Sequence, residues 1–246
     1  MTRTTHAGPA EEIAGIEKHV GGRIGLAAVD AGTGRRIDHR ADERFLMCST
    51  FKLLAVAAVL KRVDEQKEQL DRFVRYNEKD LLEYAPVTRA HVGEGGMKLG
   101  ELCAATIEQS DNTAANLLLD SMGGPKSVTD FARSIGDGIT RLDRKEPELN
   151  TVAASPDWDT TSPAAMAADL QRLLTTNVLS PASRQQLEAW LEQNQTGAGM
   201  IRASVPPGWK VGDKTGRSGD GAINDVAILR PPSAGPIFIA IYTVVP

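Results

Sequence analysis

A serine and a lysine three residues apart, in CSTFK at 48–52, have the types and spacing that covalent chemistry requires. An apolar run follows, so a helix beginning near Thr50 would place Ser49 at its N-terminus and Lys52 on the same face, its amine within reach of the hydroxyl. A serine hydroxyl needs such a base, and burial lowers the pKa of a lysine enough to supply one. Helix N–H groups would stabilise an oxyanion. SxxK is also common at ordinary capped helix starts, so both interpretations stand.

Three further motifs favour the chemical interpretation. SDN at 110–112 lies between helical segments, where a loop could present Ser110 and Asn112 to a cleft. KTG at 214–216 ends a predicted strand, and its glycine allows close approach of a substrate. EPELN at 146–150 lies in a polar loop. Each alone is an ordinary capping loop, strand end or solvated turn, but together and in this order they indicate one site.

The elements that must position these motifs come from both ends of the chain. Residues 10–20 have the spacing of a short amphipathic helix, and 23–30 and 35–41 are extended segments around a hairpin turn. From about 50 to 195 the pattern is helical. Three strand-like segments follow, at 209–216, 222–230 and 236–245.

These segments predict an α+β fold with one antiparallel sheet built from both chain ends and a helical block inserted between them. We expect a single domain over 1–246, with an α/β lobe at 10–45 and 196–246 and an all-α lobe at 46–195. Sites commonly form in the cleft between two such lobes.

Composition limits the function classes. A net charge of -4 gives no reason to expect nucleic acid or an acidic membrane as a partner. Cys48 and Cys103 form no CxxC pair and, with four scattered histidines, indicate buried free thiols rather than a metal site, so no metal or cofactor is expected. No apolar run approaches the ~20 residues of a membrane span. The polar start MTRTTHAGPAEE lacks a secretory signal, so the chain either stays where it is made or is a mature form with an added Met.

The motif set resembles the class A serine β-lactamases, penicillin-recognising enzymes that carry SxxK, SDN and KTG. The resemblance runs from about 10 to 243 and includes further family-like stretches: YAPVT, ELCAATIEQSDNTAANLLLD, RLDRKEPELN, DTTSP and GWKVGDKTG. It implies hydrolysis of β-lactam antibiotics without metal or cofactor, hence antibiotic resistance, by a periplasmic or secreted monomer.

The resemblance assigns catalytic roles by matching position. Ser49 would become acylated, with Lys52 as proton acceptor or shuttle; whether this lysine or the loop glutamate is the acylation base is disputed in the family. Ser110 would pass a proton to the lactam nitrogen. Glu146 and Asn150 would hold and activate the hydrolytic water.

Binding roles follow in the same way. Tyr84 matches the aromatic wall at the cleft mouth, and Asn112 would bond the side-chain amide of the substrate. The other matching positions are Lys214, Thr215 and Gly216 for the substrate carboxylate, the backbone N–H groups of Ser49 and Arg217 for the oxyanion hole, and Arg144 with Asp159 for the ion pair that holds the EPELN loop.

Two alternatives remain open. A penicillin-binding protein would form a stable acyl-enzyme, but such proteins generally lack the loop glutamate that EPELN supplies. A C-terminally shortened, inactive family member is the other, because the chain stops at IYTVVP where the family continues into a helix packed on the sheet. Losing that cover predicts a marginally stable or self-associating chain.

One position departs from the family pattern. Ile223 stands where many members have an arginine that anchors the substrate carboxylate, and Arg217 follows KTG where a small residue is usual. Arg217 would therefore either replace that anchor or crowd the cleft, and we favour the first.

Overall fold

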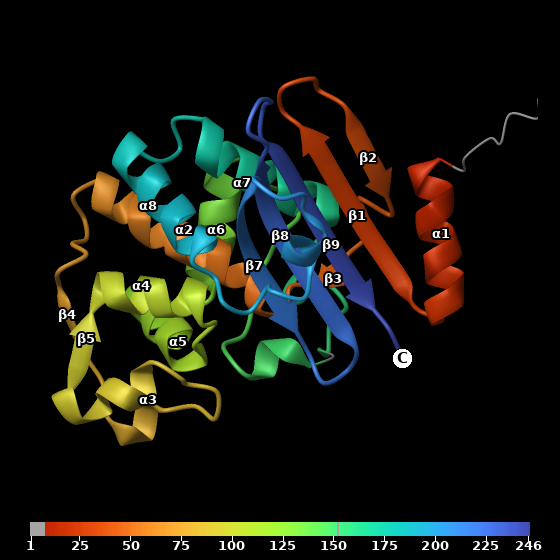
Figure 1. Ribbon diagram of the computed structural model, residues 1–246. Coiled ribbons are helices and arrows are strands. Elements are labelled where there is room, and N and C mark those ends of the chain that lie inside the picture. The colour runs from red at the N-terminus through yellow and green to blue at the C-terminus, as the bar shows by residue number, and fades with distance from the viewer. Residues whose placement is uncertain (1–7, 152) are drawn as a thin grey trace, which may run out of the picture.

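Strands from both ends of the chain form one antiparallel sheet, as the sequence predicted (Figure 1). The computed structural model describes residues 8–151 and 153–246, and the strand order is β2-β1-β9-β8-β7. The strands are β1 (Arg23–Asp30), β2 (Arg36–His39), β7 (Lys210–Arg217), β8 (Ala222–Arg230) and β9 (Ile237–Val244). β1 pairs with β9 along its whole length, from Arg23 opposite Val244 to Asp30 opposite Ile237, which joins the two ends of the chain.

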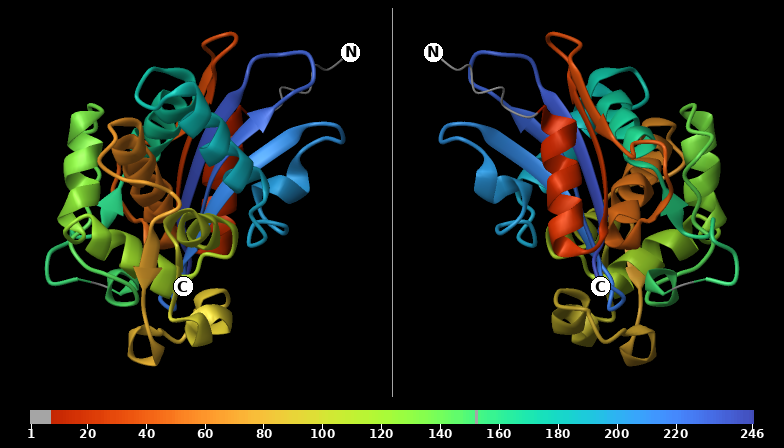
Figure 2. Two further views of the ribbon diagram at one scale, coloured as in Figure 1. Left: turned by 90° about the vertical axis from the view of Figure 1, so that its left-hand side faces the viewer. Right: turned by 90° about the vertical axis from the view of Figure 1, so that its right-hand side faces the viewer.

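Helices cover the sheet on both sides. The helices of the described chain, not all of which contact the sheet, are α1 (Pro9–Val20), α2 (Phe51–Asp64), α3 (Thr88–His91), α4 (Leu99–Glu108), α5 (Asn112–Ser121), α6 (Lys126–Ser134), α7 (Pro163–Thr175) and α8 (Pro181–Glu192). α7 packs on β1 and β9, and α8 packs on β7. Figure 2 shows these helices on one side of the sheet and α1 on the other, where it contacts β1 and β2. The predicted α+β class is confirmed.

α2 is the centre of the helical block, and its sequence explains why. Every residue from Phe51 to Leu60 is buried, including Lys52. A helix that is apolar on all sides must be surrounded by protein, so α2 contacts α4, α5, α6 and α8. The nucleophile candidate therefore precedes a helix whose first ten residues are all buried.

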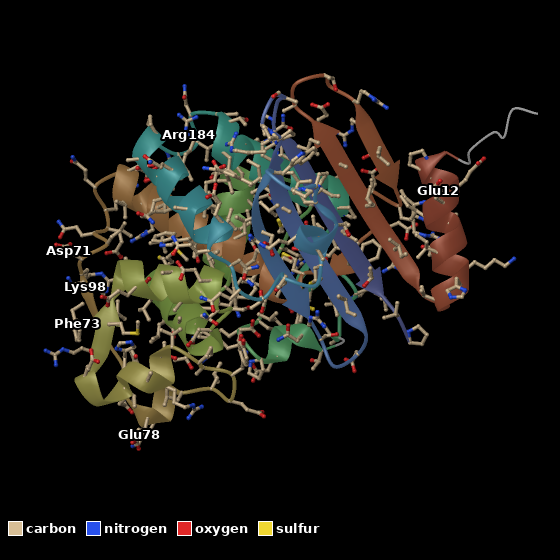
Figure 3. All side chains as sticks on the ribbon, viewed as in Figure 1. Glu12, Asp71, Phe73, Glu78, Lys98 and Arg184 are labelled. Atoms are coloured by element: carbon tan, nitrogen blue, oxygen red, sulfur yellow. The ribbon has the colours of Figure 1, made fainter. Side chains whose placement is uncertain are left out.

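Two small antiparallel ribbons were not predicted. β3 (Phe45–Leu46) pairs with β6 (Thr160–Thr161), and β4 (Phe73–Arg75) pairs with β5 (Gly96–Lys98). Strands of two or three residues are too short for an alternating pattern to be seen. Figure 3 shows Phe73 and Lys98 on the second ribbon, at the end of the molecule opposite Glu12 of α1.

The remaining differences from the sequence prediction are local. The segment expected as a strand at 35–41 is extended only over Arg36–His39, because Arg40 adopts a φ of 45° and turns the chain. Residues 1–7, on which part of the expectation about a secretory signal rests, lie outside the described residues. Over residues 8–151 and 153–246, the helices are too short or too polar to cross a bilayer.

Candidate active site

Ser49 lies in a single 3₁₀ turn, η1 (Cys48–Thr50), immediately before α2. Its hydroxyl donates to Oε1 of Glu146 at 3.1 Å, and it makes no capping bond to the helix. Cys48 has a φ of 46°, a left-handed conformation that costs energy for a residue with a side chain. The turn is fixed to the sheet by Thr50, whose hydroxyl contacts Tyr242 of β9 at 2.9 Å. The Ser49 hydroxyl is therefore directed at Glu146 rather than at the helix backbone, and the interpretation as a helix cap is wrong.

Lys52 is fully buried, but its amine does not bond Ser49. Nζ donates to Asn112 Oδ1 at 2.6 Å and to the Ser110 carbonyl at 2.7 Å, and lies 3.1 Å from Glu146 Oε1. Within the part of the chain that the structure describes, no Lys52–Ser49 hydrogen bond forms, and the expectation that the amine can reach the hydroxyl stays a prediction. Burial lowers the pKa of Lys52, and the charge of Glu146 opposes that shift. Ser49 and Lys52 instead both contact the same oxygen, Oε1 of Glu146.

The SDN motif forms the bend between α4 and α5. Ser110 has a φ of 56° at this bend. The buried carboxylate of Asp111 stabilises the bend, because it accepts from Ala114 N–H and so caps α5, and it also accepts from Thr88 N–H at 2.9 Å. Ser110 Oγ accepts from two buried amines, Lys214 Nζ at 3.0 Å and Lys52 Nζ at 3.3 Å.

Lys214 is fully buried within β7. Burial lowers its pKa to about 7, and the positive charge of Lys52 adds to the shift. Two amines with lowered pKa therefore flank one hydroxyl, which is an arrangement suited to moving a proton.

Glu146 is held by two asparagine side chains and by an ion pair that closes its loop. Asn150 Nδ2 donates to its Oε2 at 2.5 Å. Asn116 of α5 clamps its backbone, accepting from Glu146 N–H at 3.0 Å and donating to Glu146 C=O at 2.8 Å. The loop is closed by the Arg144–Asp159 ion pair at 2.6 Å, and Asp159 is buried rather than solvated. This carboxylate is thus preorganised beside Ser49.

The KTG strand closes the other side of the cleft. Gly216 lies so close to the nucleophile turn that a Cβ there would be 2.7 Å from Met47 O and 3.1 Å from Ser49 N. The glycine thus lets β7 approach the Ser49 N–H, with the Arg217 N–H next along the strand. The resulting hollow of about 380 Å³ is lined by Ser49, Tyr84, Ser110, Asn112, Asn150, Thr196, Thr215, Gly216 and Arg217.

Three site residues escaped the sequence analysis. Asn116 is one, and Thr196 is another, since its hydroxyl contacts that of Thr215 at 2.5 Å. The third is Asn224, fully buried opposite Gly216 in the sheet. Its Nδ2 donates to the carbonyls of Leu46 (2.9 Å) and Met47 (3.2 Å), which precede Ser49, and its Oδ1 accepts from Thr243 N–H. The only sequence signal for Asn224 was its place beside Asp225 as one of two polar residues near the start of a largely apolar strand.

The two cysteines are free and buried, as predicted. Burial raises the pKa of Cys48 to about 12, so the thiol beside Ser49 is held in its neutral form. Among the described residues, no group of three histidine, cysteine, aspartate or glutamate side chains is placed to hold a metal ion.

Comparison with known proteins agrees with this geometry. Residues 8–245 match the model of the β-lactamase enzyme family. β-Lactamase L2 of Stenotrophomonas maltophilia is 52% identical over 226 residues, covering 92% of this chain and 74% of that protein. A β-lactamase of Proteus vulgaris is 46% identical over 232 residues, covering 94% and 85%.

Solved structures give the same result. A β-lactamase from Burkholderia vietnamiensis superposes with a TM-score of 0.95 at 48% identity, covering 100% of this chain and 90% of that one. The last common ancestor of Gram-negative bacteria class A β-lactamase gives 0.93 at 57%, covering 96% and 89%. The fold and site define a serine hydrolase with a buried carboxylate beside its nucleophile. The chain belongs to the β-lactamase enzyme family, among the class A serine β-lactamases.

Proposed function

We propose that this chain hydrolyses the amide bond of penicillins and cephalosporins in two steps, through an ester with Ser49. The observation that carries the proposal is the direct hydrogen bond from the Ser49 hydroxyl to Glu146, a buried carboxylate whose counterion is Lys52. Family membership supports the substrate class.

In the first step, Ser49 Oγ attacks the lactam carbonyl carbon. Glu146 is the proton acceptor that the free-enzyme geometry favours, because its Oε1 is 3.1 Å from Oγ while Lys52 directs its hydrogen bonds to Ser110 and Asn112. The N–H groups of Ser49 and Arg217 stabilise the oxyanion. As the C–N bond breaks, the Ser110 hydroxyl donates a proton to the nitrogen and takes one from Lys52 Nζ, 3.3 Å away. Lys52 regains a proton from Glu146, 3.1 Å away, so that Glu146 is a carboxylate again before the second step.

In the second step, Glu146 and Asn150 hold a water molecule against the ester. The carboxylate removes a proton from this water as it attacks the carbonyl carbon, and the proton returns to Ser49 Oγ as it leaves. Such general-base assistance contributes about 10²–10⁴-fold. This assistance to deacylation distinguishes an enzyme that turns over from a protein that persists as its acyl-enzyme.

Substrate binding follows from the hydrogen-bonding capacity that the cleft leaves free. Asn112 Oδ1 is occupied by Lys52, so its Nδ2 is available to donate to the side-chain amide carbonyl of the substrate. Lys214 and Thr215, the latter aligned by Thr196, would hold the substrate carboxylate together with Arg217. Tyr84, half exposed, forms a wall of the cleft.

Intact-mass analysis during reaction with benzylpenicillin tests the proposal. The wild type should acquire a penicilloyl adduct transiently and consume substrate continuously, and Ser49→Ala should do neither. An adduct on Ser49→Ala would overturn the nucleophile assignment. A single stoichiometric burst by the wild type would instead indicate a penicillin-binding protein.

We also propose that the protein acts as a monomer in the periplasm or outside the cell, where its substrates are encountered. The support is the family alone. Cell fractionation of the native host with compartment markers, and the solution mass of the purified chain, test the two statements.

A further inference from the structure

A hollow between α2 and α6 lies in the helical lobe, at the end of α2 that is farther from Ser49. This α2–α6 hollow encloses about 460 Å³, within the range of small-molecule sites. Among the described residues, none lines both this hollow and the catalytic cleft. The segments that follow α5 and α7 complete its walls. Its apolar wall is formed by Ala58, Met122, Phe131, Ile135 and Val178.

One of the cations that line the α2–α6 hollow has no anionic partner. Arg62 lies in the last turn of α2, and its side chain contributes to the lining. Within residues 8–151 and 153–246, its guanidinium makes no ion pair, and its buried Nε finds no hydrogen-bond acceptor. A guanidinium carries five N–H donors in a planar fork, so Arg62 has hydrogen-bonding capacity left for a ligand.

The carboxylates around Arg62 are bonded to other cations. Glu65 and Asp130 line the hollow. Glu68 is also close, because the hydrogen bond from Arg72 lowers the pKa of Glu68 and the charge of Arg62 adds to this effect. The ion pairs are Glu65 with Lys67 at 2.8 Å and with Lys61 at 3.5 Å, Glu68 with Arg72 at 2.7 Å, and Asp130 with Lys126. An anion that enters the hollow therefore meets a guanidinium whose neighbouring acids are already paired.

We propose that the α2–α6 hollow binds a small aromatic carboxylate. The carboxylate accepts hydrogen bonds from the Arg62 guanidinium, and the ring packs against Met122 and Phe131 on the apolar wall. Carboxylate and guanidinium are planar groups that match each other, and charge-assisted bonds of this kind are the strong ones. Inorganic phosphate also bonds a guanidinium, but it has no apolar body to contact the wall, so the lining favours the aromatic acid.

Two-dimensional NMR of the isotope-labelled full chain, titrated with 2-naphthoate, tests the proposal because it locates the bound ligand. We expect saturable shifts of amides at the end of α2 and along α6. Arg62→Gln should weaken binding by at least about tenfold, because a charge-assisted contact is lost. Arg35→Gln, which removes one positive charge at an exposed position between β1 and β2, should leave the affinity unchanged. On the wild type, the neutral 2-naphthamide and inorganic phosphate should each bind at least about tenfold more weakly than 2-naphthoate.

A second variant fills the hollow without touching Arg62. Ser134→Trp, at an exposed position of α6 that lines the hollow, should abolish binding, while Ile37→Trp, at an exposed position of β2, should not. The dispersion of the amide spectrum shows that each variant is folded. Shifts confined to Ser110, Lys214 and their neighbours would mean that the catalytic cleft takes the carboxylate, and this would overturn the proposal. Absence of binding to the wild type, unchanged affinity in Arg62→Gln, or phosphate binding as tightly as 2-naphthoate would do the same.

Discussion

Lys52 Nζ lies 3.1 Å from Oε1 of Glu146, and both side chains are completely shielded from solvent. Two buried charges are tolerated only as a pair, because removing one partner leaves the other uncompensated. The same Oε1 accepts the Ser49 hydroxyl at 3.1 Å. The ion pair with Lys52 therefore offsets the cost of burying the Glu146 carboxylate beside Ser49.

Glu146→Gln should trap the protein as its acyl-enzyme instead of letting it turn over substrate. The amide retains the size of the side chain but cannot take a proton from Ser49 or from water, so acylation should slow as well, and deacylation should slow by about 10²–10⁴-fold. The lifetime of the benzylpenicillin adduct, followed by intact mass, measures this. Glu148→Gln is the matched control, since this exposed acid lies two residues away in the same loop. An unchanged adduct lifetime in Glu146→Gln would refute the general-base role and favour a penicillin-binding protein.

Arg217→Ala should raise KM for β-lactams with a free carboxylate by about tenfold and leave kcat nearly unchanged, as expected for uniform binding. Arg217 is paired with Ile223 in the sheet, so the two side chains share one face, the face from which an arginine at 223 would reach. Within the described chain, its guanidinium makes no ion pair.

Steady-state kinetics with a penicillin and with its methyl ester measure this contact. The ester should respond little to Arg217→Ala, and Arg217→Lys should recover part of the loss for the acid. A lower KM in Arg217→Ala would instead mean that the arginine crowds the cleft.

Lys214 should give kcat/KM an alkaline limb. Its pKa in the free protein is about 7, so the positive charge that attracts the substrate carboxylate is present below pH 7 and lost as pH rises through it. Because kcat/KM reports the free enzyme, its decline should centre near pH 7. Lys214→Arg, which stays protonated, should move this limb to higher pH even if its maximum is lower. A profile that is flat from pH 6 to 9 would exclude titration of this amine.

Asn224→Ala should slow acylation even though residue 224 does not contact the substrate. The change leaves the Leu46 and Met47 carbonyls and the Thr243 N–H without their partner, which should cost about 1–3 kcal/mol of stability. The turn bearing Ser49 should then be less well placed. Single-turnover acylation and urea unfolding separate the effects: a stability loss with an unchanged acylation rate would limit Asn224 to a structural role.

The sequence predicted the sheet and the main helices because their periodic patterns are long. Short motifs identified Ser49, Lys52, Ser110, Glu146 and the KTG strand, because fixed spacings within a few residues can be recognised without knowing the fold. Asn116, Thr196 and Asn224 act through contacts between segments 19–178 residues apart, and an isolated Asn or Thr gives no signal for such contacts. Backbone conformation could not be predicted from residue type either. Cys48, Ser110 and Asp159 have positive φ, although nothing in their residue type requires it.

Asp169→Asn should stabilise the protein at neutral and alkaline pH. Asp169 is fully buried in α7; burial and the neighbouring Asp137 raise its pKa from 3.8 to about 9, against the opposing charge of Arg172. The folded state therefore holds this proton more tightly than the unfolded chain. The resulting stability is fully present below pH 3.8 and is lost as pH rises towards 9. Its Oδ1 accepts from Arg172 Nη1 at 2.9 Å, whereas its Oδ2 finds no donor within the described residues, so ionisation leaves one oxygen without a hydrogen bond.

An amide at 169 cannot ionise and can donate to Asp137, so the gain should reach about 1–3 kcal/mol near pH 8 and shrink towards pH 5. Thermal unfolding of the wild type and Asp169→Asn at pH 5, 6.5 and 8 measures this, with a Tm increase of roughly 2–10 °C expected at pH 8. Asp130→Asn, at an exposed position of α6 where the carboxylate pairs with Lys126 as Asp169 pairs with Arg172, is the control for loss of one negative charge. A Tm difference that is independent of pH would show that Asp169 does not carry the proton in the folded state.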